Sequence, residues 1–225
     1  MGNGIVKYIK YVFDCVLNLV YDVDCGCVIC GQDIEEEYIC NRCIKKILDK
    51  EIHHFIKGEG LKFRCISAAY YSGVMKELIL KFKYKNDFKC GAIIGEILCR
   101  ILAKVAIEYD YIAYVPSSKA ALKKRGYNQA EYIAKFIAER MDKKLLHCLS
   151  KDNKAKDQIG LDNIQRWMNL KESFKIKHNK LIENSRILLV DDVVTTGATA
   201  FYCSKLLIKK GCSEVIVLTA AKSKL

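Results

Sequence analysis

The sequence predicts an α/β protein with a mainly parallel sheet, preceded by a small cysteine-rich module. Three observations support this: apolar runs of strand length alternate with helical repeats after Lys62, a strand–helix–strand unit fills the last part of the chain, and two C-x-x-C pairs lie early in it. With 225 residues, 51% of them apolar, the chain can bury a hydrophobic core. We expect three parts, an N-terminal helix at 1–24, a cysteine module at 25–50 and an α/β domain at 62–225.

The N-terminal segment is apolar on one face only. Residues 5–23 contain Lys7, Lys10 and Asp14, and a charge at mid-span costs about 2.5–3.5 kcal/mol on insertion scales. A transmembrane span is therefore disfavoured, and an amphipathic helix that docks on the protein is favoured over one that lies at a membrane surface. The apolar face consists of Ile9, Phe13, Val16 and Val20.

Cysteine usage indicates a reducing compartment. Twelve cysteines would suggest disulfides in a short secreted chain, but residues 1–18 lack the small-residue cleavage region of a signal peptide. We therefore expect a cytoplasmic protein. Cys90, Cys99 and Cys203 lie within apolar helical patterns and are expected to be core residues.

Four cysteines form a metal-binding pattern. Cys27-Val-Ile-Cys30 and Cys40-Asn-Arg-Cys43 are two C-x-x-C pairs separated by nine residues, and Gly31 suits the tight turn that directs two sulfurs at one ion. The pattern predicts a structural zinc knuckle with Cys27, Cys30, Cys40 and Cys43 as ligands. Cys25 is an alternate ligand of poorer spacing, a redox pair is the alternative for either motif alone, and iron–sulfur ligation is a minor option.

The segment after the cysteine module, residues 49–60, is charged, and its Gly58 and Gly60 are expected to mark a linker or a turn. A strand pair around Phe63–Tyr71 follows, and then two helices at Val74–Tyr84 and Asp87–Ile107.

A buried strand is expected at Tyr109–Val115, ending at Pro116, and a helix follows the capping residue Asn128. The last third predicts a βαβ unit, in which ligands sit at the carboxyl ends of the parallel strands. Its elements are a strand at Ile187–Asp192, a helix at Ala198–Lys210 with Gly211 as its C-cap, and a strand at Glu214–Ala220.

The polar residues at 191–199 have the composition of a sugar-phosphate site. Asp191 and Asp192 can accept hydrogen bonds from vicinal hydroxyls or orient waters on Mg²⁺. Gly197 allows a close backbone approach, and the free amides of a helix start favour an anion. The hydroxyl donors are Thr195, Thr196 and Thr199. A phosphorylated ribose satisfies both halves.

This segment, four apolar residues, two acids, two apolar residues and then Thr-Thr-Gly-x-Thr, resembles the phosphoribosyl pyrophosphate (PRPP) motif of type I phosphoribosyltransferases. A second block, Val115-Pro116-Ser-Ser-Lys119 through Arg125-Gly126-Tyr127-Asn128-Gln129-Ala130, is similar to the ComF competence family, which reads Val-Pro, a basic loop and Arg-Gly-Phe-Asn-Gln-Ala there. Further matches to that family are Ala68-Ala69-Tyr70, Lys81-Phe82-Lys83-Tyr84, and the downstream residues Gln158, Leu161, Arg166, Asn169 and Phe174.

The resemblance implies a type I phosphoribosyltransferase fold that binds PRPP with Mg²⁺. It implies that Asp191 and Asp192 bind the ribose hydroxyls, that Arg125 is a catalytic anion partner, and that Ser117, Ser118 and Lys119 line the pyrophosphate loop. The residues implied around the 5′-phosphate are Thr195, Thr196, Gly197, Ala198 and Thr199. Where the family often has Pro-x-His, this chain has Ser117-Ser118, so a histidine-dependent role is not carried over. The acceptor is left open.

The chain is basic, with a formal charge of +12, which favours polyanionic partners. Residues 119–156 hold 11 Lys or Arg against 4 Asp or Glu. If Tyr127 and Tyr132 are available for stacking, single-stranded DNA binding without catalysis is an alternative function; if Tyr132 packs inside, the lysines only solvate the surface. An adaptor that binds a partner of the DNA-uptake or recombination machinery through the zinc knuckle and the N-terminal helix is the third alternative.

Overall fold

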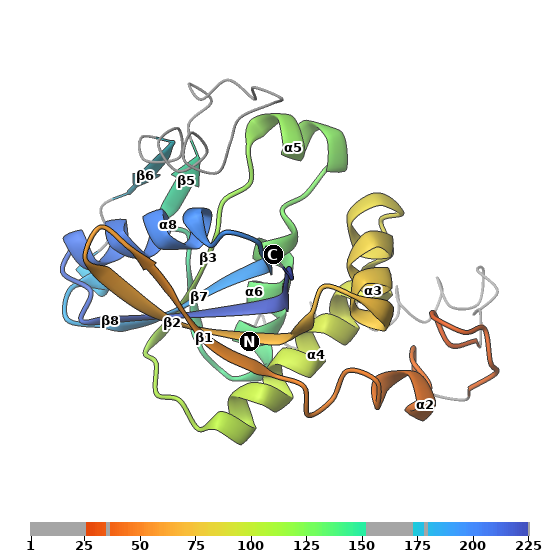
Figure 1. Cartoon of the computed structure of the whole chain (residues 1–225). Coiled ribbons are helices and arrows are strands. Elements are labelled where there is room, and N and C mark those ends of the chain that lie inside the picture. The colour runs from red at the N-terminus through yellow and green to blue at the C-terminus, as the bar shows by residue number, and fades with distance from the viewer. Residues whose placement is uncertain (1–25, 35–36, 152–172, 178–179, 225) are drawn as a thin grey trace, which may run out of the picture.

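We analysed a computed structural model of the chain, which describes residues 26–34, 37–151, 173–177 and 180–224. It shows an α/β domain with a six-stranded sheet and a small cysteine module packed beside it (Figure 1). The expected N-terminal helix at 1–24, with Cys25, lies outside the described residues, as does the part of the downstream block formed by Gln158, Leu161, Arg166 and Asn169.

Helices and strands alternate along most of the described chain. In chain order the elements are α2 (Asn41–Ile44), β1 (Ile52–Gly58), β2 (Leu61–Tyr70), α3 (Gly73–Tyr84), α4 (Phe88–Val105), β3 (Tyr111–Tyr114), α5 (Lys119–Arg125), α6 (Gln129–Arg140), β4 (Lys144–Leu146), β5 (Leu149–Lys151), β6 (Phe174–Ile176), the 3-10 turn η1 (Lys180–Ile182), β7 (Arg186–Val194), α8 (Ala198–Lys209) and β8 (Glu214–Lys222).

The large sheet has the order β1-β2-β8-β7-β3-β4, and only β1 is antiparallel to its neighbour. The prediction of a mainly parallel α/β domain is confirmed. The predicted βαβ unit is present as β7, α8 and β8, with Leu188 opposite Ile216 in the register. The remaining two strands, β5 and β6, form a separate antiparallel pair.

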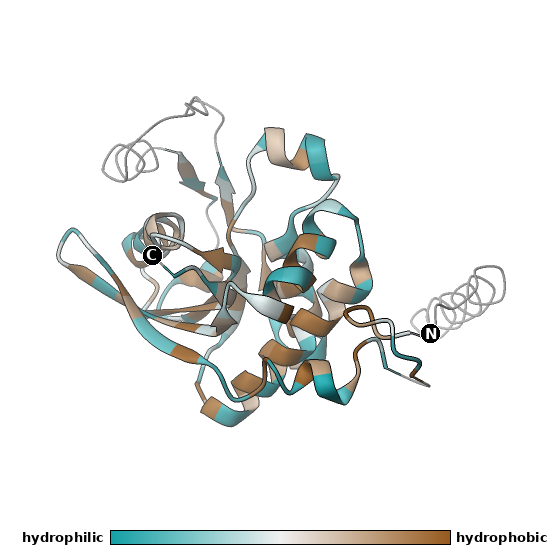
Figure 2. Ribbon diagram, turned by 45° about the vertical axis from the view of Figure 1, so that its right-hand side comes forward, coloured by the Kyte–Doolittle hydropathy of each residue, from teal (hydrophilic) through white to brown (hydrophobic). Residues whose placement is uncertain are grey.

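Successive residues of β7 point to opposite faces of the sheet, and each face has its own core. Leu188 and Val190 belong to the core that includes residues of α3, α4 and α6. Ile187 and Leu189 belong to the core that includes Phe201 and Leu207 of α8. Because both faces are covered, the strand is apolar along its whole central part, as expected for a buried parallel strand. Figure 2 shows apolar residues concentrated in the strands and in the helices packed against them.

Part of the 49–60 segment, where a linker or a turn was expected, forms a strand. β1 pairs with β2 from Ile52 opposite Ser67 to Gly58 opposite Leu61, and Glu59 and Gly60, both at positive φ, make the hairpin turn. The glycines at 58 and 60 thus mark a tight turn between strands, and the strand pair expected within Phe63–Tyr71 is instead this hairpin. The sheet begins at residue 52, ten residues before the start expected for the domain.

The cysteine module packs on the domain through a shared apolar core. Its Ile39, Cys43 and Ile47 are buried in the same cluster as residues of α3 and α4. Within the part of the chain that the structure describes, no helix is long and apolar enough to cross a membrane.

Candidate functional site

The predicted site residues gather where the chain direction reverses within the sheet. From β3 the chain runs through α5 and α6 to the outer strand β4, whereas from the adjacent β7 it runs through α8 to β8 on the other side. The carboxyl ends of β3 and β7 therefore border a topological switch point, where open α/β sheets bind their ligands. The 115–118 loop follows β3, and the acidic motif ends β7.

The two acids at the end of β7 occupy different environments. Burial and the negative charge of the adjacent Asp192 raise the pKa of the Asp191 carboxyl to about 8. One Asp191 oxygen accepts a hydrogen bond from the Asp192 amide at 2.8 Å. Asp192 itself is paired with the ammonium of Lys83, Nζ to Oδ1 at 2.8 Å, and both side chains are mostly buried. The site thus carries one carboxylate that is paired with a lysine and one carboxyl group whose pKa is raised by burial and by its acidic neighbour.

Gly197 forms the turn between β7 and α8. Its φ of 81° lies in the left-handed region, and a Cβ built there would lie 2.8 Å from Cγ2 of Ile56 on β1. Glycine is thus required both for the backbone conformation and for the approach of the hairpin. The Thr196 hydroxyl accepts a hydrogen bond from the Ala198 amide at 3.4 Å, while Thr195 is exposed and Thr199 is half-buried. A turn of this kind leaves amide donors at the start of α8 as a cradle for an anion.

Asn128 fixes the loop that follows β3. Its amide donates to the Val115 carbonyl at 3.0 Å, while its oxygen accepts from the Ser117 hydroxyl at 3.0 Å and from the Ala130 amide at 3.1 Å. One side chain therefore joins the end of β3, the predicted pyrophosphate loop and the start of α6. Ser118 caps α5 by accepting from the Ala121 amide, and Lys119 is exposed at the first position of that helix.

The end of α3 connects this loop to the acidic motif. The Tyr127 hydroxyl donates to the Phe82 carbonyl, Lys83 pairs with Asp192, and the Arg125 guanidinium lies over the Tyr84 ring at 5.4 Å. Three consecutive residues of α3 thus hold the two predicted halves of the site. Arg125 also donates to the Gln129 side chain at 3.2 Å. Its Nε is buried without a hydrogen-bond partner among the described residues, so it is poised to bind an anion.

The structure does not favour base stacking on Tyr127 and Tyr132. Both rings pack against Phe82 and Phe88, with ring centroids 4.9–5.4 Å apart. Because an aromatic cluster occupies their faces, these tyrosines fill the space between α3, α4 and α6. The structure agrees with the alternative expectation, in which Tyr132 packs inside.

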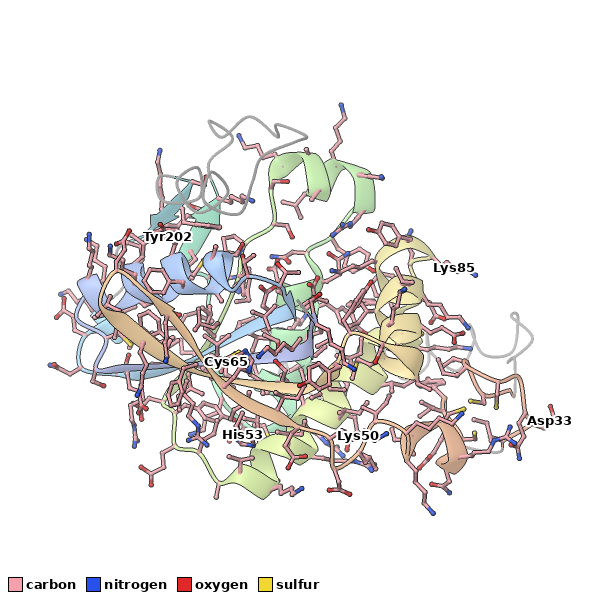
Figure 3. The ribbon with its side chains drawn as sticks, viewed as in Figure 1. Asp33, Lys50, His53, Cys65, Lys85 and Tyr202 are labelled. Carbon is pink, nitrogen blue, oxygen red and sulfur yellow. The ribbon has the colours of Figure 1, made fainter. Side chains whose placement is uncertain are left out.

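The four cysteines of the module come together as predicted. The sulfurs of Cys27, Cys30, Cys40 and Cys43 all lie within 4.8 Å of one another, and those of Cys30 and Cys40 are 3.7 Å apart. Tetrahedral zinc with Zn–S bonds of about 2.3 Å places its sulfurs about 3.8 Å apart, so the group fits the ion. Hydrogen bonding from the Gln32 amide contributes most to lowering the pKa of Cys30 to about 6, which favours the thiolate that zinc requires. Figure 3 shows the sulfur atoms gathered beside the loop that carries Asp33.

Sequence comparisons find the same relatives that the motifs indicated. The chain is 28% identical over 206 residues to Competence protein F of Haemophilus influenzae, covering 88% of this chain and 90% of that protein. It is 27% identical over 187 residues to Competence protein ComFC of Bacillus subtilis, covering 82% of this chain and 72% of that protein. The chain is therefore similar to these competence proteins over most of its length. No family model matches the sequence.

Among solved structures, this ComF-like chain is similar to adenine phosphoribosyltransferase from Thermoanaerobacter pseudethanolicus, with 16% identity and a TM-score of 0.42 over 80% of this chain and 99% of that one. The type I phosphoribosyltransferase-like fold rests on this chain's own topology. The Asp191–Thr199 motif lies at the end of a central strand of a mainly parallel sheet and leads into α8.

Sequence reasoning did not assign Lys83 to the ComF-like site. The Lys81–Tyr84 block was noted as a family match, but the pairing of Lys83 with Asp192 joins residues more than a hundred positions apart. The only signal was an amphipathic helix that places a lysine beside buried apolar residues. Asn128 was expected only as a helix cap, and its bonds to Ser117 and Val115 were likewise beyond sequence reasoning.

Proposed function

We propose that this ComF-like chain binds PRPP with Mg²⁺ at the carboxyl ends of β3 and β7 and transfers its phosphoribosyl group. The observation that carries the proposal is the arrangement at the end of β7, where two adjacent carboxyl groups are followed, after residues 193–196, by a left-handed glycine and the start of a helix. Carboxylates suit the ribose hydroxyls, and the amides at the helix start suit the 5′-phosphate. A simple anion would use the amides at the helix start but would have no need of the carboxylates.

Each predicted residue has a role that its position supports. Asp191 and Asp192 accept hydrogen bonds from the ribose hydroxyls, and residues 195–199 surround the 5′-phosphate. Ser117, Ser118 and Lys119 face the pyrophosphate, and Arg125, whose Nε is buried without a partner among the described residues, neutralises part of its charge.

Lys83 has two effects in this proposal. Its ammonium pairs with the Asp192 carboxylate in the free protein, and it adds a positive charge close to a ligand that carries several negative ones. Mg²⁺, when bound, supplies further positive charge to the pyrophosphate leaving group through oxygen ligands. Bond cleavage at C1 of the ribose then releases pyrophosphate, and the acceptor attacks the sugar.

The names of the relatives suggest the context. Two of them are called competence proteins, and we propose that this chain supports DNA uptake or processing in the cytoplasm. The basic residues Lys119, Lys123 and Lys124 on exposed positions of α5 lie beside the site and suit a polyanionic acceptor or a bound single strand.

Calorimetric titration of the zinc-loaded protein tests the ligand. PRPP with Mg²⁺ is expected to bind, and ribose 5-phosphate and pyrophosphate are each expected to bind more weakly, because each satisfies only half of the site. Equal affinity for PRPP and pyrophosphate would show a general anion site and contradict the proposal. Release of pyrophosphate on addition of single-stranded DNA or nucleobases then identifies the acceptor class.

Noncatalytic DNA binding is the second candidate, favoured by the charge of α5. It predicts an affinity for single strands that falls steeply with salt and is unchanged by PRPP. Loss of that affinity on replacing Lys123 and Lys124 with Gln, with PRPP binding absent in the unaltered protein, would favour this candidate over the first.

A further inference from the structure

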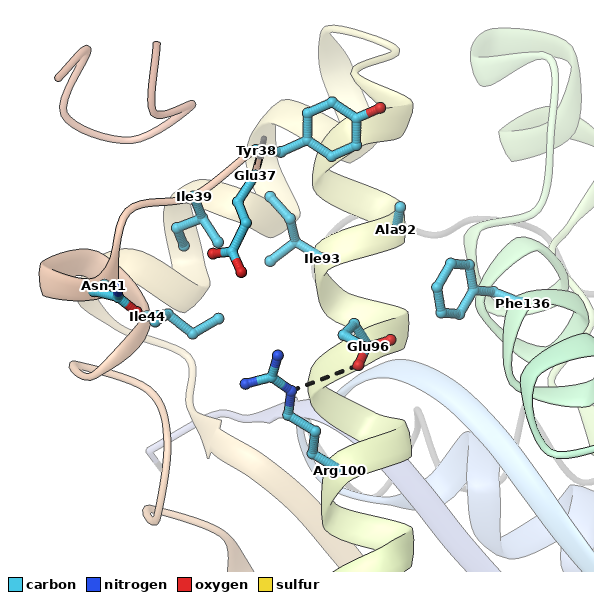
Figure 4. A pocket seen from close by; sticks show the side chains of 10 residues that line it. All are labelled: Glu37, Tyr38, Ile39, Asn41, Ile44, Ala92, Ile93, Glu96, Arg100 and Phe136. Carbon is cyan, nitrogen blue, oxygen red and sulfur yellow. Dashed lines mark ion pairs between the residues drawn. The ribbon is translucent and has the colours of Figure 1, made fainter. Parts of the chain in front are cut away.

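A groove lies between the cysteine module and the helices of the α/β domain, remote from the acidic motif. Its volume is about 420 Å³. The module contributes Tyr38, Ile39 and Ile44, α4 contributes Ile93 and Glu96, and α6 contributes Phe136 (Figure 4). We call this the knuckle groove.

The knuckle groove is apolar at its base and charged at its rim. Ile39 and Ile93 are buried, whereas Tyr38, which also lines the groove, is 49% exposed. Phe136 can approach α4 because Gly95 has no side chain; a Cβ there would lie 2.4 Å from the ring. Glu96 pairs with Arg100 at 3.5 Å and with Arg140 at 3.6 Å. The groove therefore resembles the sites that accept an amphipathic helix, an apolar base between charged edges.

We propose that the knuckle groove is the docking site of this chain's own N-terminal segment, residues 5–23, bound as an amphipathic helix. The segment carries apolar residues at spacings of four, three and four, which is the anchor pattern of a helix lying in a groove. These anchors are Ile9, Phe13, Val16 and Val20.

The start of the described chain lies next to the groove. The Val28 amide donates to the Tyr38 carbonyl at 3.0 Å, and the Cys40 amide donates to the Cys27 sulfur at 3.3 Å. Gly26, the first described residue, is therefore two residues from Val28, which is hydrogen-bonded to the segment that carries Tyr38. Only Asp24 and Cys25 separate it from the proposed helix, so docking in the same chain needs no long connection.

The dimensions and charges also agree. Nineteen residues of helix are about 28 Å long, and the stretch of α4 from Ala92 to Arg100 is about 12 Å, so two or three of the anchors fit within the groove. Glu37 and Arg100 line the groove with opposite charges, and Lys10 and Asp14, one helical turn apart beside the apolar face, provide charges of both signs. Burying this apolar face removes the surface that would otherwise remain exposed.

Site-specific photo-crosslinking in the zinc-loaded full-length chain tests the proposal. Benzoylphenylalanine at position 13 is expected to crosslink within one chain to residues 37–44 or 92–100, as mapped by mass spectrometry. The matched control places the same group at position 18, on the opposite face of the expected helix. Its yield to those segments is expected to be about tenfold lower, because only one face of a docked helix meets the groove.

Each other occupant gives a different product. Crosslinks that join two chains would assign the groove to a second copy of the protein. Crosslinks that form only with lipid, when phosphatidylglycerol vesicles are added, would assign the segment to a membrane surface. Equal yields at positions 13 and 18, or products outside the groove, would also overturn the proposal.

Hydrogen exchange gives an independent measurement. Phe13→Asp is expected to increase amide exchange in residues 37–44 and 92–100 by about tenfold or more, because a docked helix shields them from local opening. Asn18→Asp adds the same charge on the other face and is expected to leave those amides unchanged. Unchanged exchange in both variants would contradict docking.

Discussion

The charged groups at the two ends of strand β7 lie in different environments. At the amino end, Arg186 donates to both oxygens of Asp110, at 3.2 and 3.4 Å from its side chain and at 2.8 Å from its backbone, and it also pairs with Glu108. These bonds hold the pKa of the Asp110 carboxyl below its usual range. At the carboxyl end, burial beside Asp192 raises the pKa of Asp191 to about 8.

The amino end of β7 has the features of a structural ion pair, and the carboxyl end has those of a functional site. The charges at the amino end satisfy one another, as in a pairing that needs no ligand. At the carboxyl end a carboxyl group, a buried Arg125 Nε and a left-handed glycine are held in costly arrangements by the surrounding packing. Such costs concentrate at functional sites, where a ligand relieves them.

The largest expected effect comes from removing the positive charge that pairs with Asp192 at the carboxyl end. Lys83→Met leaves Asp192 mostly buried without its partner, and we expect it to lower the free energy of unfolding by about 3 kcal/mol. Urea denaturation measures this. Lys76→Met, at an exposed position of the same helix, is expected to change stability by less than about 0.5 kcal/mol. Equal effects would show that the ion pair contributes no more than a surface charge.

A second comparison uses two left-handed glycines at opposite ends of α8. Gly197→Ala and Gly211→Ala are both expected to lower the free energy of unfolding by about 1–2 kcal/mol, because both residues have positive φ. Only at 197 would the new Cβ meet a side chain at 2.8 Å; at 211 its nearest neighbour would lie 3.5 Å away. PRPP affinity measured by calorimetry should fall only in Gly197→Ala, because Gly197 lies in the segment proposed to surround the 5′-phosphate. A fall in both variants would indicate a general loss of folding.

The two ends should respond to pH in opposite directions. Asp191 has a folded-state pKa of about 8, above its unfolded value near 4, so its contribution to stability is present below about pH 4 and is lost as pH rises toward 8. The slope is about 1.4 kcal/mol per pH unit at most. Asp191→Asn should flatten it in urea titrations between pH 6 and 8. A slope unchanged by this substitution would assign the dependence to another group.

The smallest effect is expected at the amino end. Asp110 and Arg186 are each more than a third exposed, so Asp110→Asn should cost less than about 1 kcal/mol. The loss should be seen at neutral pH and disappear in acid, because the lowered pKa stabilises the fold only above the unfolded pKa. Thermal unfolding at pH 7 and pH 3 checks this, and a larger loss at pH 3 would be the wrong sign.

The sequence predicted local features better than long-range ones. The cysteine cluster and the strand, turn and helix around Asp191–Thr199 are encoded by short spacings, and both are present. Residues 49–60 were expected to hold a linker or a turn; the turn is present, but strand β1 was not expected, because its alternation of exposed and buried residues contains a single fully buried position, Ile56. Its pairing with β2 provides the stabilisation that the local sequence does not show.

The candidate site shows the same limit. Asp192 and Lys83 meet only because α3 packs beside the end of β7, and the aromatic cluster that occupies Tyr127 and Tyr132 joins three helices. Charge composition at 119–156 indicated a basic surface but not which rings remain available for a ligand. Contacts of this kind depend on tertiary packing, which no spacing in the sequence specifies.

The most direct test of the central claim compares the two ends of β7 in one experiment. PRPP with Mg²⁺ is titrated calorimetrically into the unaltered zinc-loaded protein, into Asp191→Asn plus Asp192→Asn, and into Asp110→Asn. We predict binding to the unaltered protein and to Asp110→Asn, and none to the double variant. Equal binding by all three, or none by the unaltered protein, would contradict a ribose-phosphate site at the carboxyl end of β7.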